Sequence, residues 1–325
     1  MVDMQANTPE WYPTGVGLNA GKLEFTIADF SQQSINQSFF EPLSFAKSSA
    51  RKIAFPALPG DDSSLRKPDA LIFHGSRCGS TLVSQMLGSL PGTVSLSEPA
   101  IFDQLVSLRS SGDISDKVCA EAMRYVANEF TQHRLDRNGR FFLKVDSWHV
   151  SHFEAYTSAF GKLPAIYMYR EPARVLLSHK RERGRQMVTK LMPGHLRGLD
   201  LPPITSGDDF DTVADMVLSH FYQTAVLLAK NGSIHLVNYS DLPAWTWETL
   251  PPLLGWNLGE NGVALMRERT KTDSKRKGDP FQDFIKHPES AEPAMVPVEP
   301  GQALKQAYET LETLRLEQRL GASAG

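Results

Sequence analysis

A short loop between two apolar segments carries the residue types that bind anions. Residues 70–74 are largely apolar, residues 75–81 read GSRCGST, and a helix-like apolar pattern follows from residue 82. Glycines let the backbone approach a ligand, successive N–H groups can point inward, and the first turn of a helix adds partial positive charge. The pattern therefore predicts a phosphate-like ligand, although a plain glycine turn with Ser80 as a helix N-cap would use the same residues. Arg77 favours the anion, because a charge at the buried end of a strand is costly without a counterion.

A loop of this kind normally has a lysine when it binds nucleoside triphosphates. In the pattern G-x-x-x-x-G-K-[ST], the lysine contacts the β- and γ-phosphates and the hydroxyl contacts magnesium. Ser80 takes the lysine position in this chain. A kinase or nucleotide hydrolase is therefore an alternative that lacks its main cation, and a nucleotide-binding module without catalytic activity is another.

The loop resembles the 5′-phosphosulfate loop of sulfotransferases, whose usual form is P-[KR]-S-G-T-[ST] followed by a helix. The matching positions are Ser76, Arg77, Cys78, Gly79, Ser80 and Thr81. The resemblance implies that these residues bind the 5′-phosphate of the sulfuryl donor 3′-phosphoadenosine-5′-phosphosulfate (PAPS). It also implies that Arg77 neutralises charge on the bridging oxygen during transfer. Cys78 replaces the family's serine, which removes a hydroxyl ligand and keeps the backbone N–H.

A second segment resembles the 3′-phosphate site of the same family, R-[DN]-P-x-D-x-x-x-S. It matches at Arg170, Pro172 and Ser178, directly after the apolar residues 165–169. Pro172 suits the first position of a helix, and a helix N-terminus beside an arginine suits a phosphate. The resemblance assigns Arg170 and Ser178 to the donor, against the alternative of a surface helix with solvated charges. The departures are Glu171 for Asp or Asn and Arg174 for the second Asp.

Two shorter fragments fit the same resemblance less closely. Residues 235–242 read HLVNYSDL and resemble the family's Tyr-Glu-Asp-Leu step, which implies that Tyr239 lies near the adenine. Residues 274–280 read SKRKGDP and resemble a late R-K-G-x-x-G-D segment. By that resemblance Arg276, Lys277 and Gly278 close over the 3′-phosphate. Taken alone, the fragment indicates a solvated basic loop.

Transfer to a hydroxyl needs a base near the donor, and two carboxyl groups follow predicted strands. Glu98 comes directly after residues 93–97 and resembles the base glutamate of tyrosyl-protein and several bacterial sulfotransferases, so it is the preferred base. Asp146 follows residues 141–145, where many cytosolic members have a histidine, and is the second candidate. Lys144 is expected to reach the sulfuryl group. Without the resemblance, Glu98 is a helix N-terminal carboxylate and Asp146 an N-cap.

Nine histidines raise the question of a metal site. His149 and His152 are the only close pair beside a carboxylate, Glu154, and no HExxH-type arrangement occurs. We therefore expect no metal. His149, His152, His179 and His220 are interpreted as polar or packing residues on helices.

The elements that position these residues alternate along the chain. The apolar runs are 70–74, 93–97, 141–145, 165–169 and 234–239, and the helical patterns between them are 101–135, 172–183 and 209–230. This alternation predicts an α/β fold with a mainly parallel sheet flanked by helices, in which ligands lie at the carboxyl ends of strands. The resemblance implies the P-loop-like sulfotransferase version of that fold. We expect an N-terminal accessory segment at 1–66, with one strand at 22–30, and an α/β domain at 67–325 that ends in an amphipathic helix.

Composition limits the remaining possibilities. A net charge of -3 at pH 7 argues against a general nucleic-acid binder and leaves room for a local basic pocket. Two cysteines support neither a disulfide framework nor structural zinc, and no apolar run could cross a bilayer, so we expect a cytoplasmic protein. The acceptor is expected to be a small or carrier-bound hydroxyl compound. Residues 185–210 are expected to form a lid over it or a surface loop, and its identity and the oligomeric state are left open.

Overall fold

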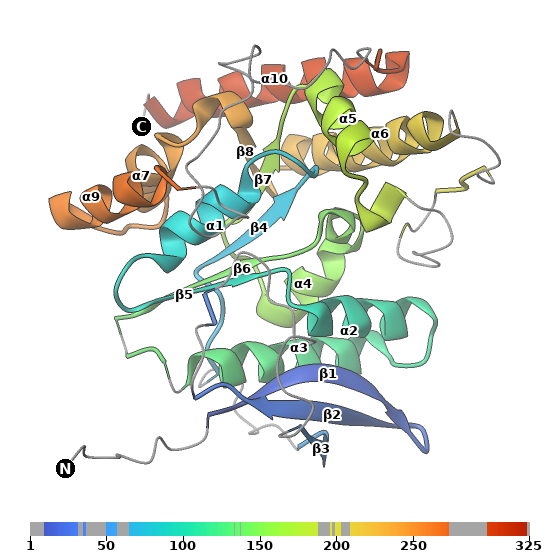
Figure 1. Cartoon of the computed structure of the whole chain (residues 1–325), viewed down its shortest axis with the longest axis vertical. Helices are drawn as coiled ribbons and strands as arrows, with labels where there is room; N and C mark the ends of the chain where they lie inside the picture. Colours follow the sequence, from blue (N-terminus) through green and yellow to red (C-terminus); the bar gives the residue numbers. More distant parts are fainter. Residues whose placement is uncertain are drawn as a thin grey trace.

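The computed structural model describes residues 10–31, 35–36, 50–56, 65–132, 134–136, 138–187, 196, 199–202, 209–272 and 298–323. Within these ranges five strands form one sheet in the order β5-β6-β4-β7-β8, and every neighbouring pair is parallel (Figure 1). The strands are β4 Ala70–His74, β5 Thr93–Ser97, β6 Arg140–Lys144, β7 Ala165–Tyr169 and β8 His235–Asn238. The predicted α/β fold with a parallel sheet is confirmed.

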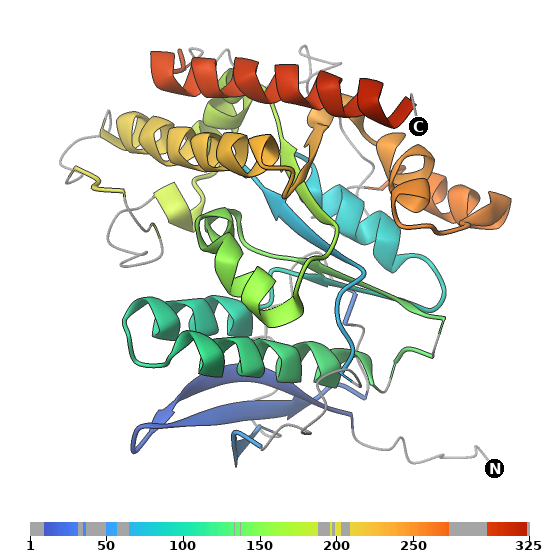
Figure 2. The same cartoon turned by 180° about the vertical axis from the view of Figure 1, so that it is seen from behind.

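Helices connect the strands and lie on both sides of the sheet (Figures 1 and 2). They are α1 Ser80–Gly88, α2 Ala100–Ser110, α3 Asp116–Thr131, α4 Phe153–Phe160, α5 Pro172–Arg181, α6 Asp209–Lys230, α7 Trp245–Glu248, α8 Leu250–Leu253, α9 Gly259–Arg269 and α10 Gln302–Ser323, with short 3₁₀ turns η3 Ser147–His152, η4 Arg185–Met187 and η6 Tyr239–Asp241. The single helix predicted at 101–135 is two helices, because Gly112 (φ 81°) turns the chain between α2 and α3. No helix among the described residues is long and apolar enough to span a membrane.

Alternate residues of β4 enter two separate hydrophobic clusters. Leu71 and Phe73 belong to a cluster that includes residues of α2 to α6 and α10. Ala70 and Ile72 belong to a second cluster with residues of α1 and of α7 to α9. Both faces of the central strand are therefore covered. This explains why β4 is an unbroken apolar run up to His74 rather than an alternating pattern.

An antiparallel sheet precedes the parallel one and packs on α2 and α3. Its strands are β1 Trp11–Asn19, β2 Lys22–Asp29 and β3 Arg51–Ala54. Ala20 and Gly21 turn the first hairpin with φ of 48° and 75°, which a type I′ turn requires. Tyr12 of β1 stacks on Phe130 of α3 at 5.3 Å between ring centres. The prediction of a single strand here was wrong, because β1 contains Pro13 and glycines that disfavour strands and pairs with β2 through an irregular register at that proline.

Candidate active site

Five strand ends meet at one edge of the parallel sheet and bring the singled-out residues together. Because the strands are parallel, their carboxyl ends point the same way. The side chains at or directly after these ends are His74, Glu98, Lys144, Arg170 and Tyr239. They come from five separate segments of the chain, and His74 is the one that the sequence motifs did not indicate.

The loop from Gly75 to Gly79 has a backbone conformation that most residues avoid. The φ angle is 69° at Ser76, 50° at Arg77 and 81° at Gly79. Each non-glycine residue in this left-handed region costs about 1 kcal/mol or more, so surrounding contacts must hold the loop. Strain of this kind clusters at ligand sites in native proteins.

Both glycines of the loop are required by close neighbours. A Cβ on Gly75 would lie 2.6 Å from Cε1 of Tyr222, and a Cβ on Gly79 would lie 2.7 Å from Cδ1 of Leu242. Gly79 is also the N-cap of α1, whereas the plain-turn alternative has Ser80 in that role. The helix has no side-chain cap and no acidic residue in its first turn. The first turn of α1 therefore supplies no carboxylate to balance the partial positive charge at this helix end, and an anionic ligand could do so.

Three polar side chains hold Ser76, and none of them was predicted to belong to the site. The Ser76 N–H donates to Nδ1 of His74 at 3.2 Å. Its Oγ lies 3.0 Å from Nε2 of His179 on α5 and 3.0 Å from Nε2 of Gln186 in η4. His179 and Gln186 are 1% and 6% exposed. One signal could have found His179: it directly follows Ser178 in the second motif.

A buried ion pair links the ends of three adjacent strands. The Lys144 side chain is 0% exposed, and its Nζ donates to Oε1 of Glu98 and, at 3.2 Å, to Oγ of Ser97. Nε2 of His74 lies 3.1 Å from the same Oε1. Because Nδ1 of His74 accepts the Ser76 N–H, the neutral ring carries its proton on Nε2 and donates it to Glu98. Lys144 ends the strand between those of Glu98 and His74, so sheet order alone assembles this trio.

These contacts fix the charge of Glu98. Burial alone would raise the pKa of the carboxyl, but the attraction of Lys144 and the hydrogen bond from His74 outweigh it and hold the pKa well below its usual range. Glu98 is therefore ionised at neutral pH. Both partners bind Oε1, and Oε2 has no hydrogen bond or ion pair with another described residue. The residue also has a left-handed φ of 53°.

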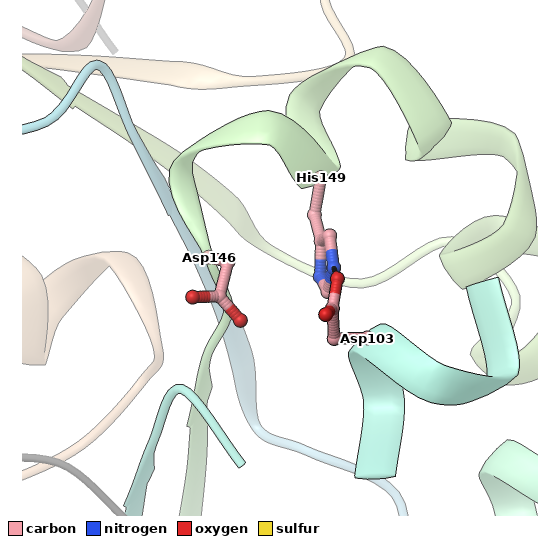
Figure 3. Close-up of side chains that lie close together, drawn as sticks. All are labelled: Asp103, Asp146 and His149. Atoms are coloured by element: carbon pink, nitrogen blue, oxygen red, sulfur yellow. Dashed lines mark hydrogen bonds and ion pairs between the residues drawn. The ribbon is translucent and has the colours of Figure 1, made fainter. Parts of the chain in front are cut away.

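Asp146 lies in a neighbouring polar group with Asp103 and His149 (Figure 3). One ligand atom from each of the three lies within 4.8 Å of the others. Oδ1 of Asp103 accepts a hydrogen bond from Nε1 of Trp148 at 2.7 Å and another from Nε2 of His149 at 3.2 Å. The Tyr156 hydroxyl lies 2.6 Å from Nδ1 of His149 and donates to it in the neutral ring. The proton on Nε2 occupies the lone pair that a metal needs, so these contacts favour a hydrogen-bonded network.

The pKa of Asp146 is shifted in the opposite direction to that of Glu98. Burial, followed by repulsion from Glu98 and Asp103, raises the pKa of Asp146 well above its usual value. Its carboxyl group makes no cap and no other hydrogen bond to a described residue. The environments of these two carboxyl groups therefore push their pKa values apart, which is typical of sites that use one group as a base and keep the other protonated.

Arg170 joins the two predicted donor-binding segments. Its guanidinium lies 4.2 Å from the ring centre of Tyr239, and Nη1 donates to the carbonyl of Arg77 at 3.3 Å. Arg77 itself bonds to the end of α5, at 3.0 Å to the Glu182 carboxylate and 2.5 Å to the Glu182 carbonyl. The Ser178 hydroxyl is half-buried and makes no hydrogen bond to another described residue.

The other loop residues offer backbone groups and small hydroxyls. Cys78 is fully buried, its thiol donates to the carbonyl of Met168 at 3.2 Å, and burial raises its pKa to about 11. Ser80 and Thr81 lie in the first turn of α1 and are 4% and 6% exposed. The predicted residues Arg276, Lys277 and Gly278 lie outside the described residues, as does much of 185–210.

The C-terminal helix α10 holds the segment that carries Tyr239. The Asn238 amide donates to Oε1 of Glu312 at 2.8 Å. Arg315 donates to both carboxylate oxygens of Asp241 at 3.1 Å, and each of these side chains is 8% exposed. Because Tyr239 lies between Asn238 and Asp241, α10 fixes this side of the site. The motif resemblance ends near residue 280 and gave no indication of this role.

Comparisons with known proteins find similar solved structures. No protein-family model and no curated protein matches the chain. The structure is similar to the sulfotransferase domain from the curacin biosynthetic pathway, with a TM-score of 0.48 and 14% identity over 77% of this chain and 99% of that one. It is also similar to the sulfotransferase domain of the Synechococcus PCC 7002 olefin synthase, with a TM-score of 0.48 and 16% identity over 79% and 98%. For sulfotransferase STF9 from Mycobacterium avium, the TM-score is 0.45 and the identity 14%, over 79% and 77%.

Proposed function

We propose that the protein is a sulfotransferase that moves a sulfuryl group from PAPS to a hydroxyl, with an amine as the second acceptor class. The observation that carries this proposal is the meeting of the 75–81 loop, Arg170 and the ionised Glu98 at one edge of the sheet. The loop and Arg170 suit two separate phosphate groups of one donor, and Glu98 supplies a base. A triphosphate enzyme would lack the lysine that Ser80 replaces.

The residues of the loop fit the 5′-phosphate of such a donor. Gly75 and Gly79 have no space for a side chain, and the α1 N-terminus has no side-chain cap. Arg170 and Ser178 would take the 3′-phosphate, and Tyr239, whose ring already lies against Arg170, would contact the adenine. A role for residues 276–278 at the same phosphate stays a prediction. When bound, PAPS supplies the sulfuryl group, and the protein orients it and removes a proton from the acceptor.

Glu98 is the base in this proposal. It is ionised, and its Oε2 is available to accept a proton from an acceptor hydroxyl. A low pKa weakens a base, but the hydroxyl becomes more acidic as its oxygen bonds to sulfur, so proton transfer becomes favourable during the in-line step. The raised pKa of Asp146 makes it the carboxyl group of the pair that binds a proton more tightly.

Lys144 and Arg77 are the cations that would stabilise negative charge during transfer. Lys144 is held in position by Ser97 and Glu98 and would stabilise negative charge on the transferred group. Arg77 would neutralise the bridging oxygen, which requires it to leave Glu182. The carboxylate of that partner is 77% exposed, so its ion pair with Arg77 is weak, and Arg77 must also give up its hydrogen bond to the Glu182 carbonyl. Arg77→Ala should therefore reduce turnover, whereas Arg170→Ala should chiefly weaken donor binding.

Calorimetric titration tests the nucleotide specificity directly. The probes are 3′,5′-adenosine bisphosphate (PAP), 5′-AMP, and ATP with magnesium. Metal-independent binding of PAP that is lost without its 3′-phosphate supports both phosphate sites and justifies a search among hydroxyl acceptors, small or carrier-bound. A preference for magnesium-ATP would instead assign the loop to a kinase-like enzyme and overturn the proposal.

The base assignment has a separate test in two isosteric variants. Glu98→Gln should lower kcat by about 100-fold or more with little change in PAP affinity, because general-base catalysis typically contributes 10²–10⁴-fold. Asp146→Asn removes a carboxyl group that takes no proton from the acceptor in this proposal, so its kcat should stay close to that of the wild type. An active Glu98→Gln beside an inactive Asp146→Asn would transfer the role of base to Asp146.

A further inference from the structure

The hydroxyl of Ser76 has an unusual set of hydrogen-bond partners. Ser76 is 6% exposed and has a left-handed φ of 69°. Its Oγ lies 3.0 Å from Nε2 of His179 and 3.0 Å from Nε2 of Gln186. A serine hydroxyl can accept two hydrogen bonds and donate one. The protonation of the neighbouring nitrogens decides whether the Ser76 hydroxyl accepts a hydrogen bond from each of them or donates one.

A backbone contact settles the role of His179. The N–H of Gly184 donates to Nδ1 of His179 at 3.2 Å, so Nδ1 accepts and the neutral ring carries its proton on Nε2. Nε2 therefore donates to Ser76. The amide nitrogen of Gln186 is also a donor. Both accepting positions of the Ser76 oxygen are filled, and its own proton has no acceptor among the described residues.

This arrangement excludes one chemistry and favours another. A serine nucleophile needs a histidine nitrogen that can accept its proton, and Nε2 of His179 already carries one. The backbone N–H of Ser76 is bonded to His74, so the hydroxyl is the remaining donor of this residue. A nearly buried donor without an acceptor is costly unless a ligand supplies an oxygen.

We propose that His179 and Gln186 are positioning residues that make the Ser76 hydroxyl an obligate hydrogen-bond donor to the anion bound by the 75–81 loop. The inference rests on the anion site of the proposed function, but it does not depend on which nucleotide supplies the anion. The same role for Ser76 explains why the chain keeps a left-handed backbone at this residue. The contacts with His74, His179 and Gln186 hold the strained residue and orient its proton in the same step.

The test is calorimetric binding of PAP to the full chain and its variants. Ser76→Ala and His179→Met should each weaken binding by about tenfold or more, since a hydrogen bond to a charged group is worth that much. The double variant should bind no more weakly than Ser76→Ala alone, because His179 acts through that hydroxyl. His179→Gln keeps a donor near the position of Nε2 and should restore the wild-type affinity.

A matched control separates this role from general stability. His220 on α6 makes a comparable contact, 2.9 Å from Nε2 to Oγ of Ser151. His220→Met should leave PAP affinity unchanged even where it lowers the melting temperature. Because Ser76→Ala removes only a hydroxyl, it tests the donor even where a His179 variant fails to fold. Gln186→Met removes the second hydrogen bond to the Ser76 hydroxyl and provides another test of the positioning role.

The outcomes distinguish this inference from the proposed function. Unchanged affinity in Ser76→Ala, or additive losses in the double variant, would overturn the inference while PAP binding by the wild type leaves the function standing. If the wild type prefers magnesium-ATP and the same variants weaken that binding, the function fails and the inference holds. A wild type that binds none of the nucleotides contradicts both.

Discussion

Replacing Lys144 by methionine should destabilise the protein strongly, because it leaves the Glu98 carboxylate in a buried position without its cation. The Lys144 side chain is 0% exposed and that of Glu98 is 18% exposed. Removing one partner of a buried ion pair typically costs about 3–5 kcal/mol. Glu98→Gln in the Lys144→Met background should recover much of this loss, because the uncompensated charge is then gone.

Urea unfolding followed by tryptophan fluorescence and circular dichroism measures the effect. With an m value of roughly 3 kcal/mol/M for a chain of this size, the midpoint should fall by about 1 M or more. Lys52→Met is the matched control: its pair with Glu24 has the lysine 73% exposed, so solvent screens the pair and the loss of stability should be small. A Lys144→Met loss as small as that of the control, or a double variant no more stable than Lys144→Met, would refute the reasoning.

The same variant should change the response to acid. The pKa of Glu98 is lowered in the folded protein, so its contribution to stability is present above the unfolded value of about 4.3 and is lost as the pH falls below it. In Lys144→Met the carboxyl lacks its cation and burial raises its pKa. The difference in unfolding free energy between the two proteins should therefore shrink on acidification. A constant difference from pH 7 to pH 4 would contradict this account.

Three further predictions concern other parts of the site. Because the pKa of Asp146 is raised in the folded protein, the contribution of this residue to stability is present at low pH and is lost as the pH rises through its folded pKa. Asp146→Asn should therefore be more stable than the wild type at pH 7 and 8 and no more stable near pH 3. Urea titration at each pH measures this difference. Arg315→Met should cost about 3 kcal/mol by leaving Asp241 with weaker compensation, and it should also weaken PAP binding because α10 holds the Tyr239 segment. Cys78 should react with a thiol reagent only after unfolding, since it is 0% exposed and its pKa is about 11; rapid labelling of the folded protein would show that the loop opens.

Much of the loop could be predicted from contiguous residues, because its features are local. An unbroken apolar run, a glycine-bounded turn and a helical pattern define strand, loop and helix without reference to the rest of the chain. The same applies to Pro172 after Arg170 and to the amphipathic stripe of α10. Local signals failed at β1, where Pro13 and glycines hide a strand that exists through pairing with β2 and packing on α3.

Charge states and hydrogen-bond partners were decided only by the tertiary structure. The order β5-β6-β4 places Lys144 between Glu98 and His74, and that neighbourhood makes Glu98 ionised while Asp146 gains proton affinity. Sequence spacing identified both carboxyl groups as candidates but could not predict that their pKa values shift in opposite directions. A pKa depends on burial and on charges that come close only after folding. The contacts of His179 and Gln186 with Ser76 have the same origin: both residues are about a hundred positions from the loop in sequence, and α5 and η4, which carry them, both pack on α6.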